Sequence, residues 1–194
     1  MINLDNLPIG FFNLHDSKLL ASLVSQVPDF GIIVELGSFL GRTAVIIGRH
    51  AKSNVRIFCI DRFDEKFKCQ VHFHDWYENQ YPQLGQEFDV YNEFRKNTQE
   101  FTNITVIKGK SPNEIKFTNE PIDMFFLDAA HKNPNCLENL NFFCPLVKSN
   151  GIICGHDFLD KFPDVQQNVY MLEKLYNKKA TVSSHGSFWM IRKP

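Results

Sequence analysis

A strong charge of either sign is absent from this sequence, because 21 lysine and arginine residues almost balance 22 aspartate and glutamate residues. The balance gives no electrostatic reason to expect nucleic acid or an anionic membrane as a partner. No apolar run approaches the roughly 20 residues that a membrane-spanning helix needs, and the first residues lack the basic and apolar regions of a signal peptide. We therefore expect a cytoplasmic protein without nucleic-acid or membrane partners.

Cysteine is also scarce. The five cysteines are odd in number and form no C-x-x-C pair, so the sequence does not carry the pattern of a disulfide framework. Cys59 and Cys154 lie inside apolar runs, where a free thiol behaves as a small hydrophobic side chain. These features indicate a reducing compartment.

Internal repeats and low-complexity segments are missing, and short β-like runs alternate with helical stretches along the chain. This alternation is typical of an α/β protein with a mostly parallel sheet. Strands are expected at residues 31–36, 55–60, 104–107, 122–127 and 151–154, the last after a turn at 149–151, with a closing antiparallel hairpin at 180–183 and 187–192. Helices are expected at residues 14–27, 41–51, 88–101, 135–147 and 163–177, with a brief one opening at Ser111.

The 194 residues suit one domain, residues 1–194, which we expect to be a doubly wound sheet of seven strands. On such sheets, ligands bind beyond the carboxyl ends of the strands. A long irregular stretch at 61–86 falls between the second strand and the following helix, and connections of this length are usually binding loops or lids. We expect a lid that contacts the substrate, with a metal site or a solvated surface as alternatives. Its polar and aromatic residues include His72, His74, Asp75, Trp76, Tyr77 and Tyr81.

The first candidate ligand site is the segment Glu35–Gly41, where a buried strand ends in an acidic residue before a glycine-bearing turn and a helix. Gly37 would let the backbone turn sharply and approach a ligand, and Gly41 would permit close helix–strand packing. Asp61 closes the next strand, where an acidic residue of nucleotide-binding α/β units accepts hydrogen bonds from ribose hydroxyls. An ordinary strand–helix turn, with Asp61 as a helix cap or salt-bridge partner, is the structural alternative.

These residues resemble those of a known family. VELGSFLGRTA followed by CID resembles motifs I and II of the class I S-adenosylmethionine-dependent methyltransferases. The resemblance implies a Rossmann-like fold with S-adenosylmethionine as the cofactor. It also implies which residues line the methionine part of the cofactor, namely Glu35, Gly37, Ser38 and Gly41, and it assigns the ribose to Asp61.

The resemblance continues after the later strands. Lys108–Ser111 resembles the family's G-x-S segment, which implies that Lys110 and Ser111 lie near the adenine. Phe126–His131 resembles the F-x-D-x-x-H segment, and Leu146–Asp157 resembles the stretch that ends in His-Asp. The set is most similar to small enzymes associated with methylation of sugar or natural-product hydroxyls. It therefore implies a small-molecule or saccharide acceptor.

Four polar residues follow two neighbouring strands and are expected to meet at the edge of the sheet: Asp128, His131, His156 and Asp157. Methyl transfer to a hydroxyl requires that its proton be removed and that the oxygen be aligned. His131 or His156 could be the general base. Alternatively, Asp128 and Asp157, with His156, could hold a divalent cation such as Mg²⁺, which would lower the pKa of the hydroxyl. Asp128 could also bind the cofactor or cap the next helix, and His156 and Asp157 could simply hold a loop.

Two other functions stay open. Tyr170 and Lys174 match the Y-x-x-x-K pair of NAD(P)-dependent reductases, but the glycine triple and the preceding serine of that family are missing. A non-catalytic cofactor-binding module is the second alternative. A nucleic-acid base is disfavoured as the acceptor, because Asp128–His131 does not match the Asn/Asp-Pro-Pro-Tyr-like segment of N-methyltransferases. A homo-oligomer stays open as well.

Overall fold

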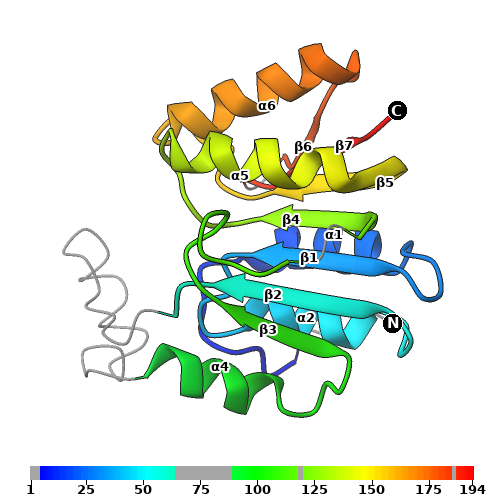
Figure 1. The fold of residues 1–194 in the computed structure, drawn as a ribbon, viewed down its shortest axis with the longest axis vertical. Coiled ribbons are helices and arrows are strands. Elements are labelled where there is room, and N and C mark those ends of the chain that lie inside the picture. The colour runs from blue at the N-terminus through cyan, green and yellow to red at the C-terminus, as the bar shows by residue number, and fades with distance from the viewer. Residues whose placement is uncertain (1–4, 64–88, 118–119, 185–186) are drawn as a thin grey trace.

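The computed structural model describes residues 5–63, 89–117, 120–184 and 187–194, and their strands form one seven-stranded sheet. The strand order is β3-β2-β1-β4-β5-β7-β6 (Figure 1). The first five strands are parallel, β7 runs antiparallel to β5, and β6 runs antiparallel to β7. The bounds are β1 Ile32–Leu36, β2 Arg56–Asp61, β3 Ile104–Lys108, β4 Ile122–Leu127, β5 Val147–Gly155, β6 Thr181–Val182 and β7 Trp189–Arg192. The predicted doubly wound, mostly parallel sheet with an antiparallel C-terminal end is confirmed.

Helices cover both faces of this sheet (Figure 1). One face carries α1 (Leu14–Val24), α2 (Arg42–His50) and α4 (Val90–Thr98), and the other carries α5 (Asn135–Phe143) and α6 (Pro163–Tyr176). Two separate apolar clusters fill the spaces between the sheet and these two layers. None of the helices in the described part of the chain combines the length and the apolar character that crossing a bilayer requires.

The central strands are hydrophobic on both sides because helices cover both sides. Ile33 and Met124 face the α1–α2 layer, whereas Val34 and Phe125 face the α5–α6 layer, and all four are completely buried. Burying each of these side chains contributes about 1.5–3 kcal/mol. The largely apolar runs of β1 and β4 are therefore the signal that identified the centre of the sheet.

Two predicted boundaries around β5 were wrong. The helix expected to reach residue 147 ends at Phe143, because Pro145 lacks an N–H and the chain continues as a short 3₁₀ helix, η2 (Cys144–Leu146). The strand then begins at Val147, not at Gly151, and the predicted turn is an irregularity within β5, with Asn150 at φ +62°.

The brief helix predicted to open at Ser111 is also absent from the described part of the chain after β3. The residues that follow Ser111 form a turn instead.

The segment before α1 is fastened to α2 by arginine side chains. Arg42 donates from Nε to the carbonyl oxygen of Phe12 (2.8 Å) and from Nη1 to that of Pro8 (2.9 Å). Arg49 donates to the carbonyl oxygen of Asp5 at 2.6 Å. These bonds fix the chain that leads into α1, and they set where the first turn of α1 lies.

Candidate functional site

The turn after β1 lies against the chain that leaves β4. The N–H of Gly37 donates to the carbonyl oxygen of Ile60 (2.9 Å), and the N–H of Asp128 donates to that of Leu36 (2.8 Å). Gly37 has φ +95°, and a Cβ at this position would come 2.0 Å from the Asp128 carbonyl oxygen. Only glycine therefore allows the two loops to approach so closely, and this approach brings Asp128 beside the turn.

Glu35 lies beneath this turn and is completely buried. Its Oε2 accepts a hydrogen bond from the Ser38 hydroxyl at 2.5 Å, while Oε1 has no hydrogen-bond partner among the described residues. Burial raises the pKa of Glu35 to about 7. The carboxyl group thus holds the loop from below, and its contact with the methionine part of a cofactor stays a prediction.

Asp61 connects the β1–α2 loop to the segment after β2. Its Oδ2 accepts from the N–H of Phe39 and its Oδ1 from the N–H of Phe63, both at 2.9 Å. A carboxylate has about four acceptor positions. Two backbone bonds therefore leave capacity on Asp61 for the hydroxyl groups of a ligand.

The other predicted cofactor residues occupy different surroundings. Gly41 has φ +90° at the start of α2, and a Cβ there would come 3.2 Å from Phe94 and Thr98, so its contacts are with α4. Lys110 is exposed. The Ser111 hydroxyl is buried after β3 and has no hydrogen-bond partner among the described residues. Asp61 thus keeps acceptor positions and Ser111 an unpaired hydroxyl, and their binding to a nucleoside stays a prediction.

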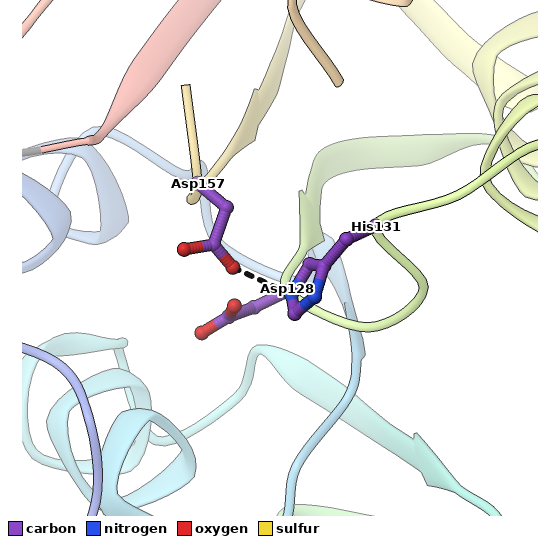
Figure 2. A group of neighbouring side chains, drawn as sticks. All are labelled: Asp128, His131 and Asp157. Atoms are coloured by element: carbon purple, nitrogen blue, oxygen red, sulfur yellow. Dashed lines mark ion pairs between the residues drawn. The ribbon is translucent and has the colours of Figure 1, made fainter. Parts of the chain in front are cut away.

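A second group of side chains lies where β4 and β5 end (Figure 2). Asp128, His131 and Asp157 point toward one another, and one ligand atom from each lies within 4.8 Å of the others. The Nε2 atom of His131 is 2.6 Å from Oδ2 of Asp157, and the His131 ring packs on Phe162 with 4.3 Å between ring centroids. Two carboxylates and an imidazole could hold a divalent cation, or the His131–Asp157 pair could move a proton.

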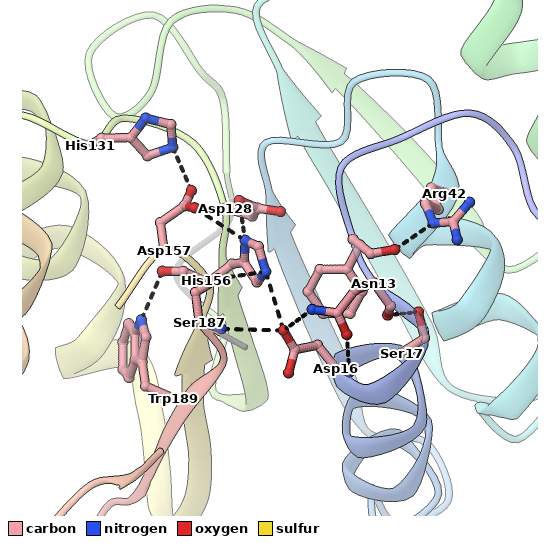
Figure 3. A network of polar contacts seen from close by, with 11 residues as sticks. Asn13, Asp16, Ser17, Arg42, Asp128, His131, His156, Asp157, Ser187 and Trp189 are labelled. Carbon is pink, nitrogen blue, oxygen red and sulfur yellow. Dashed lines mark hydrogen bonds and ion pairs between the residues drawn. The ribbon is translucent and has the colours of Figure 1, made fainter. Parts of the chain in front are cut away.

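His156 is buried at the centre of a wider network (Figure 3). Its Nδ1 lies 3.3 Å from Oδ1 of Asp157 and 3.8 Å from Oδ1 of Asp128. Its Nε2 lies 2.8 Å from the Ser187 hydroxyl and 3.4 Å from Oδ2 of Asp16. Burial disfavours the charged ring, but hydrogen bonds to Asp157 and Asp16 outweigh this effect and raise the pKa of His156 to about 10.

The predicted role of His156 as a base does not fit this position. At neutral pH the ring already carries its second proton, and both nitrogens face partners inside the protein. Its charge instead compensates the surrounding carboxylates. Burial raises the pKa of Asp128, and burial also opposes ionisation of Asp157, but hydrogen bonds to His131 and His156 hold the pKa of Asp157 well below its ordinary value.

Sequence reasoning missed Asp16 and Ser187, which contact His156 from α1 and from the segment before β7. The one local signal at Asp16 was the pattern Asn13-x-x-Asp16, which indicates a helix cap and not a site. The predicted lid residues, which include His72, His74, Asp75, Trp76, Tyr77 and Tyr81, lie outside the described residues. Tyr170 is exposed on α6, with its ring against Phe158.

Comparison with known proteins gives one family and a common fold. A family model described as a methyltransferase domain matches residues 34–158, whereas no curated protein matches the chain. The precorrin-6y C5,15-methyltransferase from Geobacter metallireducens GS-15 is similar with TM-score 0.65 and 13% identity, over 96% of this chain and 93% of that one. The O-methyltransferase NovP gives TM-score 0.66 and 13% identity, over 96% and 84%. An rRNA methylase from Streptococcus thermophilus gives TM-score 0.58 and 13% identity, over 96% and 98%.

Proposed function

Since this chain belongs to the methyltransferase-domain family, with S-adenosylmethionine as the expected cofactor, we propose that it methylates a hydroxyl group of a small molecule or saccharide. Family membership leaves no support for the reductase alternative based on Tyr170 and Lys174. The acceptor atom is the part that goes beyond the family, because structures of the same fold include an O-methyltransferase, a C5,15-methyltransferase and an rRNA methylase.

The observation that carries the proposal is the pair formed by His131 and Asp157. Their atoms Nε2 and Oδ2 lie 2.6 Å apart, and Asp128 lies beside them, next to the Gly37 turn. A base oriented by a carboxylate is the arrangement that takes a proton from a hydroxyl. A carbon acceptor that is already nucleophilic would not need a base to remove a proton before transfer. The His131–Asp157 pair therefore favours an oxygen acceptor.

The residues divide into two sets in this proposal. Asp61 and Ser111 would hold the nucleoside, and Glu35 and Ser38 would keep the loop beneath it in place. When bound, S-adenosylmethionine supplies an electrophilic methyl group on a sulfonium. Asp157 would accept a hydrogen bond from the Nε2–H group of His131, which leaves the unprotonated Nδ1 of that ring to take the hydroxyl proton.

A divalent cation at the same residues is the second candidate, because Asp128, His131 and Asp157 offer two oxygens and a nitrogen within 4.8 Å. Such a donor set suits Mg²⁺ or a similar ion when oxygen ligands dominate. The cation would have to displace the proton between His131 and Asp157, so its binding would weaken at low pH. It would activate the same hydroxyl by lowering the pKa of that group.

The test is incubation of the wild-type protein with S-adenosylmethionine and a panel of phenols and saccharides, with either MgCl₂ or EDTA present. We expect a methyl ether by mass spectrometry, and we expect His131→Ala to lose it. Activity that survives EDTA supports the base, and activity that requires Mg²⁺ supports the cation. Binding of S-adenosylhomocysteine with no transfer to any hydroxyl would contradict the proposal and favour a cofactor-binding module.

A further inference from the structure

Asp16 is a charged residue in an unusual place. It lies in the first turn of α1 and is completely buried, although it belongs to no predicted motif. Its Oδ2 accepts a 2.7 Å hydrogen bond from the side chain of Asn13, whose own oxygen caps the N–H of Asp16. A residue that only helps to cap a helix can stay at the surface, where water still solvates its carboxylate. A buried carboxylate loses this solvation, which is costly unless the carboxylate is paired with a charge. The burial of Asp16 therefore requires another explanation.

The group that lies against the Asp16 carboxylate is the ring of His156. Oδ2 of Asp16 lies 3.4 Å from Nε2 of His156, and the same oxygen accepts from the backbone N–H of Ser187 at 3.3 Å. The Ser187 hydroxyl lies 2.8 Å from the same ring nitrogen. Two groups from opposite ends of the chain thus fix one edge of the His156 ring, as Figure 3 shows.

The opposite edge of that ring faces the proposed chemistry. Nδ1 of His156 is 3.3 Å from Oδ1 of Asp157, and the other oxygen of Asp157 is 2.6 Å from His131. The ring of Phe12 packs on His156 at 4.9 Å between centroids and limits its rotation. A continuous series of contacts therefore runs from Asp16 through His156 and Asp157 to His131.

We propose that Asp16 is a positioning residue for methyl transfer, because it holds the His156 ring in the orientation that fixes Asp157 against His131. This inference rests on the proposed function of the His131–Asp157 pair. Asp16 itself touches none of the predicted cofactor or acceptor groups among the described residues. It acts through His156, so its removal should change how well His131 is aligned and not how tightly the cofactor binds.

The decisive variant is Asp16→Asn, which keeps the shape of the side chain and removes its charge. Its matched control is Asp123→Asn, because Asp123 is another largely buried carboxylate, which pairs with Lys148 and accepts from Ile32 at the other end of β4. Both variants should lose thermal stability. Only Asp16→Asn should move the ¹⁵N chemical shifts of the His156 and His131 rings, and both should bind S-adenosylhomocysteine within about twofold of wild type.

Turnover gives the second readout, with the hydroxyl acceptor that responds in the panel above. Asp16→Asn should lower kcat by about tenfold or more with acceptor KM nearly unchanged, while Asp123→Asn retains kcat. Unmoved ring shifts, or a loss of kcat no larger than that of Asp123→Asn, would overturn the inference.

The failure of the proposed function can be told apart from the failure of this inference. If no hydroxyl is methylated, the proposed function fails, but the ring shifts still decide whether Asp16 positions His131. If Asp16→Asn does not fold, Ser187→Ala is the second variant, because it removes the hydroxyl that contacts Nε2 of His156. It must then move the ¹⁵N shifts of the His156 and His131 rings.

Discussion

The Nε2 atom of His131 lies 2.6 Å from Oδ2 of Asp157, although the two residues follow different strands of the sheet. Asp157 adopts φ +63°, a left-handed conformation that few residues other than glycine, asparagine and aspartate adopt readily. The backbone is thus held in an uncommon conformation at the residue whose side chain meets both histidines. Conformations of this kind persist where the surrounding structure enforces them.

His131 and Asp157 should behave as one catalytic unit. We expect His131→Ala and Asp157→Asn each to lower kcat for methyl transfer by about 100-fold or more, because general-base catalysis contributes on the order of 10²–10⁴. The double variant should be little worse than either single variant, since each removes the same function. Asp29→Asn, at an exposed pair with Lys52, serves as the control and should retain full turnover. Additive losses in the double variant would show that the two residues act separately.

Asp61 should contribute to cofactor affinity. Replacing it by alanine removes a carboxylate whose remaining acceptor positions would bind ribose hydroxyls, and charged hydrogen bonds of this kind are worth about 1.5–3 kcal/mol. We expect Asp61→Ala to weaken S-adenosylhomocysteine binding by about tenfold to 150-fold, measured by titration calorimetry. Unchanged affinity would exclude Asp61 from the nucleoside site.

Gly37 should tolerate no side chain. In Gly37→Ala the new Cβ would meet the Asp128 carbonyl oxygen at 2.0 Å, and the residue would also have to keep φ +95°. The left-handed backbone alone costs about 1–3 kcal/mol, and the clash adds to it. We expect urea unfolding to show a loss of about 3 kcal/mol or more. A stable variant would mean that the loops after β1 and β4 can separate.

Glu35 should make stability depend on pH. The pKa of this carboxyl rises from 4.5 to about 7 on folding, so the folded state keeps a proton that the unfolded chain has already released between these values. Its contribution to stability is therefore complete below about pH 4.5 and is lost as the pH rises through about 7. Glu35→Gln mimics the protonated form and should remove this dependence.

Unfolding in urea at pH 5 and pH 8 measures the effect of Glu35. Relative to wild type, Glu35→Gln should gain about 2.5 kcal/mol between the two pH values, since each pKa unit corresponds to about 1.4 kcal/mol and pH 5 already lies above the unfolded pKa. Groups that do not interact with Glu35 change with pH in both proteins and cancel in the comparison. Parallel stability curves for the two proteins would contradict the buried, protonated state of Glu35.

Much of the fold could be predicted from local patterns. Largely apolar runs such as 31–36 and 122–127 identified central strands, because strands covered on both faces carry apolar residues on both sides. The pattern failed around Asn150, where β5 continues through residues that resemble a turn. A strand irregularity depends on the register with β4, and register is set by contacts between distant residues.

The candidate site was predicted in part for a similar reason. Asp128, His131, His156 and Asp157 follow the ends of adjacent strands, so their meeting could be predicted from topology. The difference between His131 and His156 could not, because His131 is partly exposed and His156 is buried, and burial depends on what packs above the strand ends. Asp16 was missed because its partner, His156, follows β5, far along the chain.

The bond between Ser187 and Asp16 joins residues 171 positions apart. The turn of Gly37 and the carboxylate of Asp61, in contrast, belong to one short stretch of chain that a ribosome delivers early. The histidine network is completed only once both ends of the polypeptide are available, so a product truncated before Ser187 would retain the motifs of the family yet lack the Ser187 contacts to His156 and Asp16.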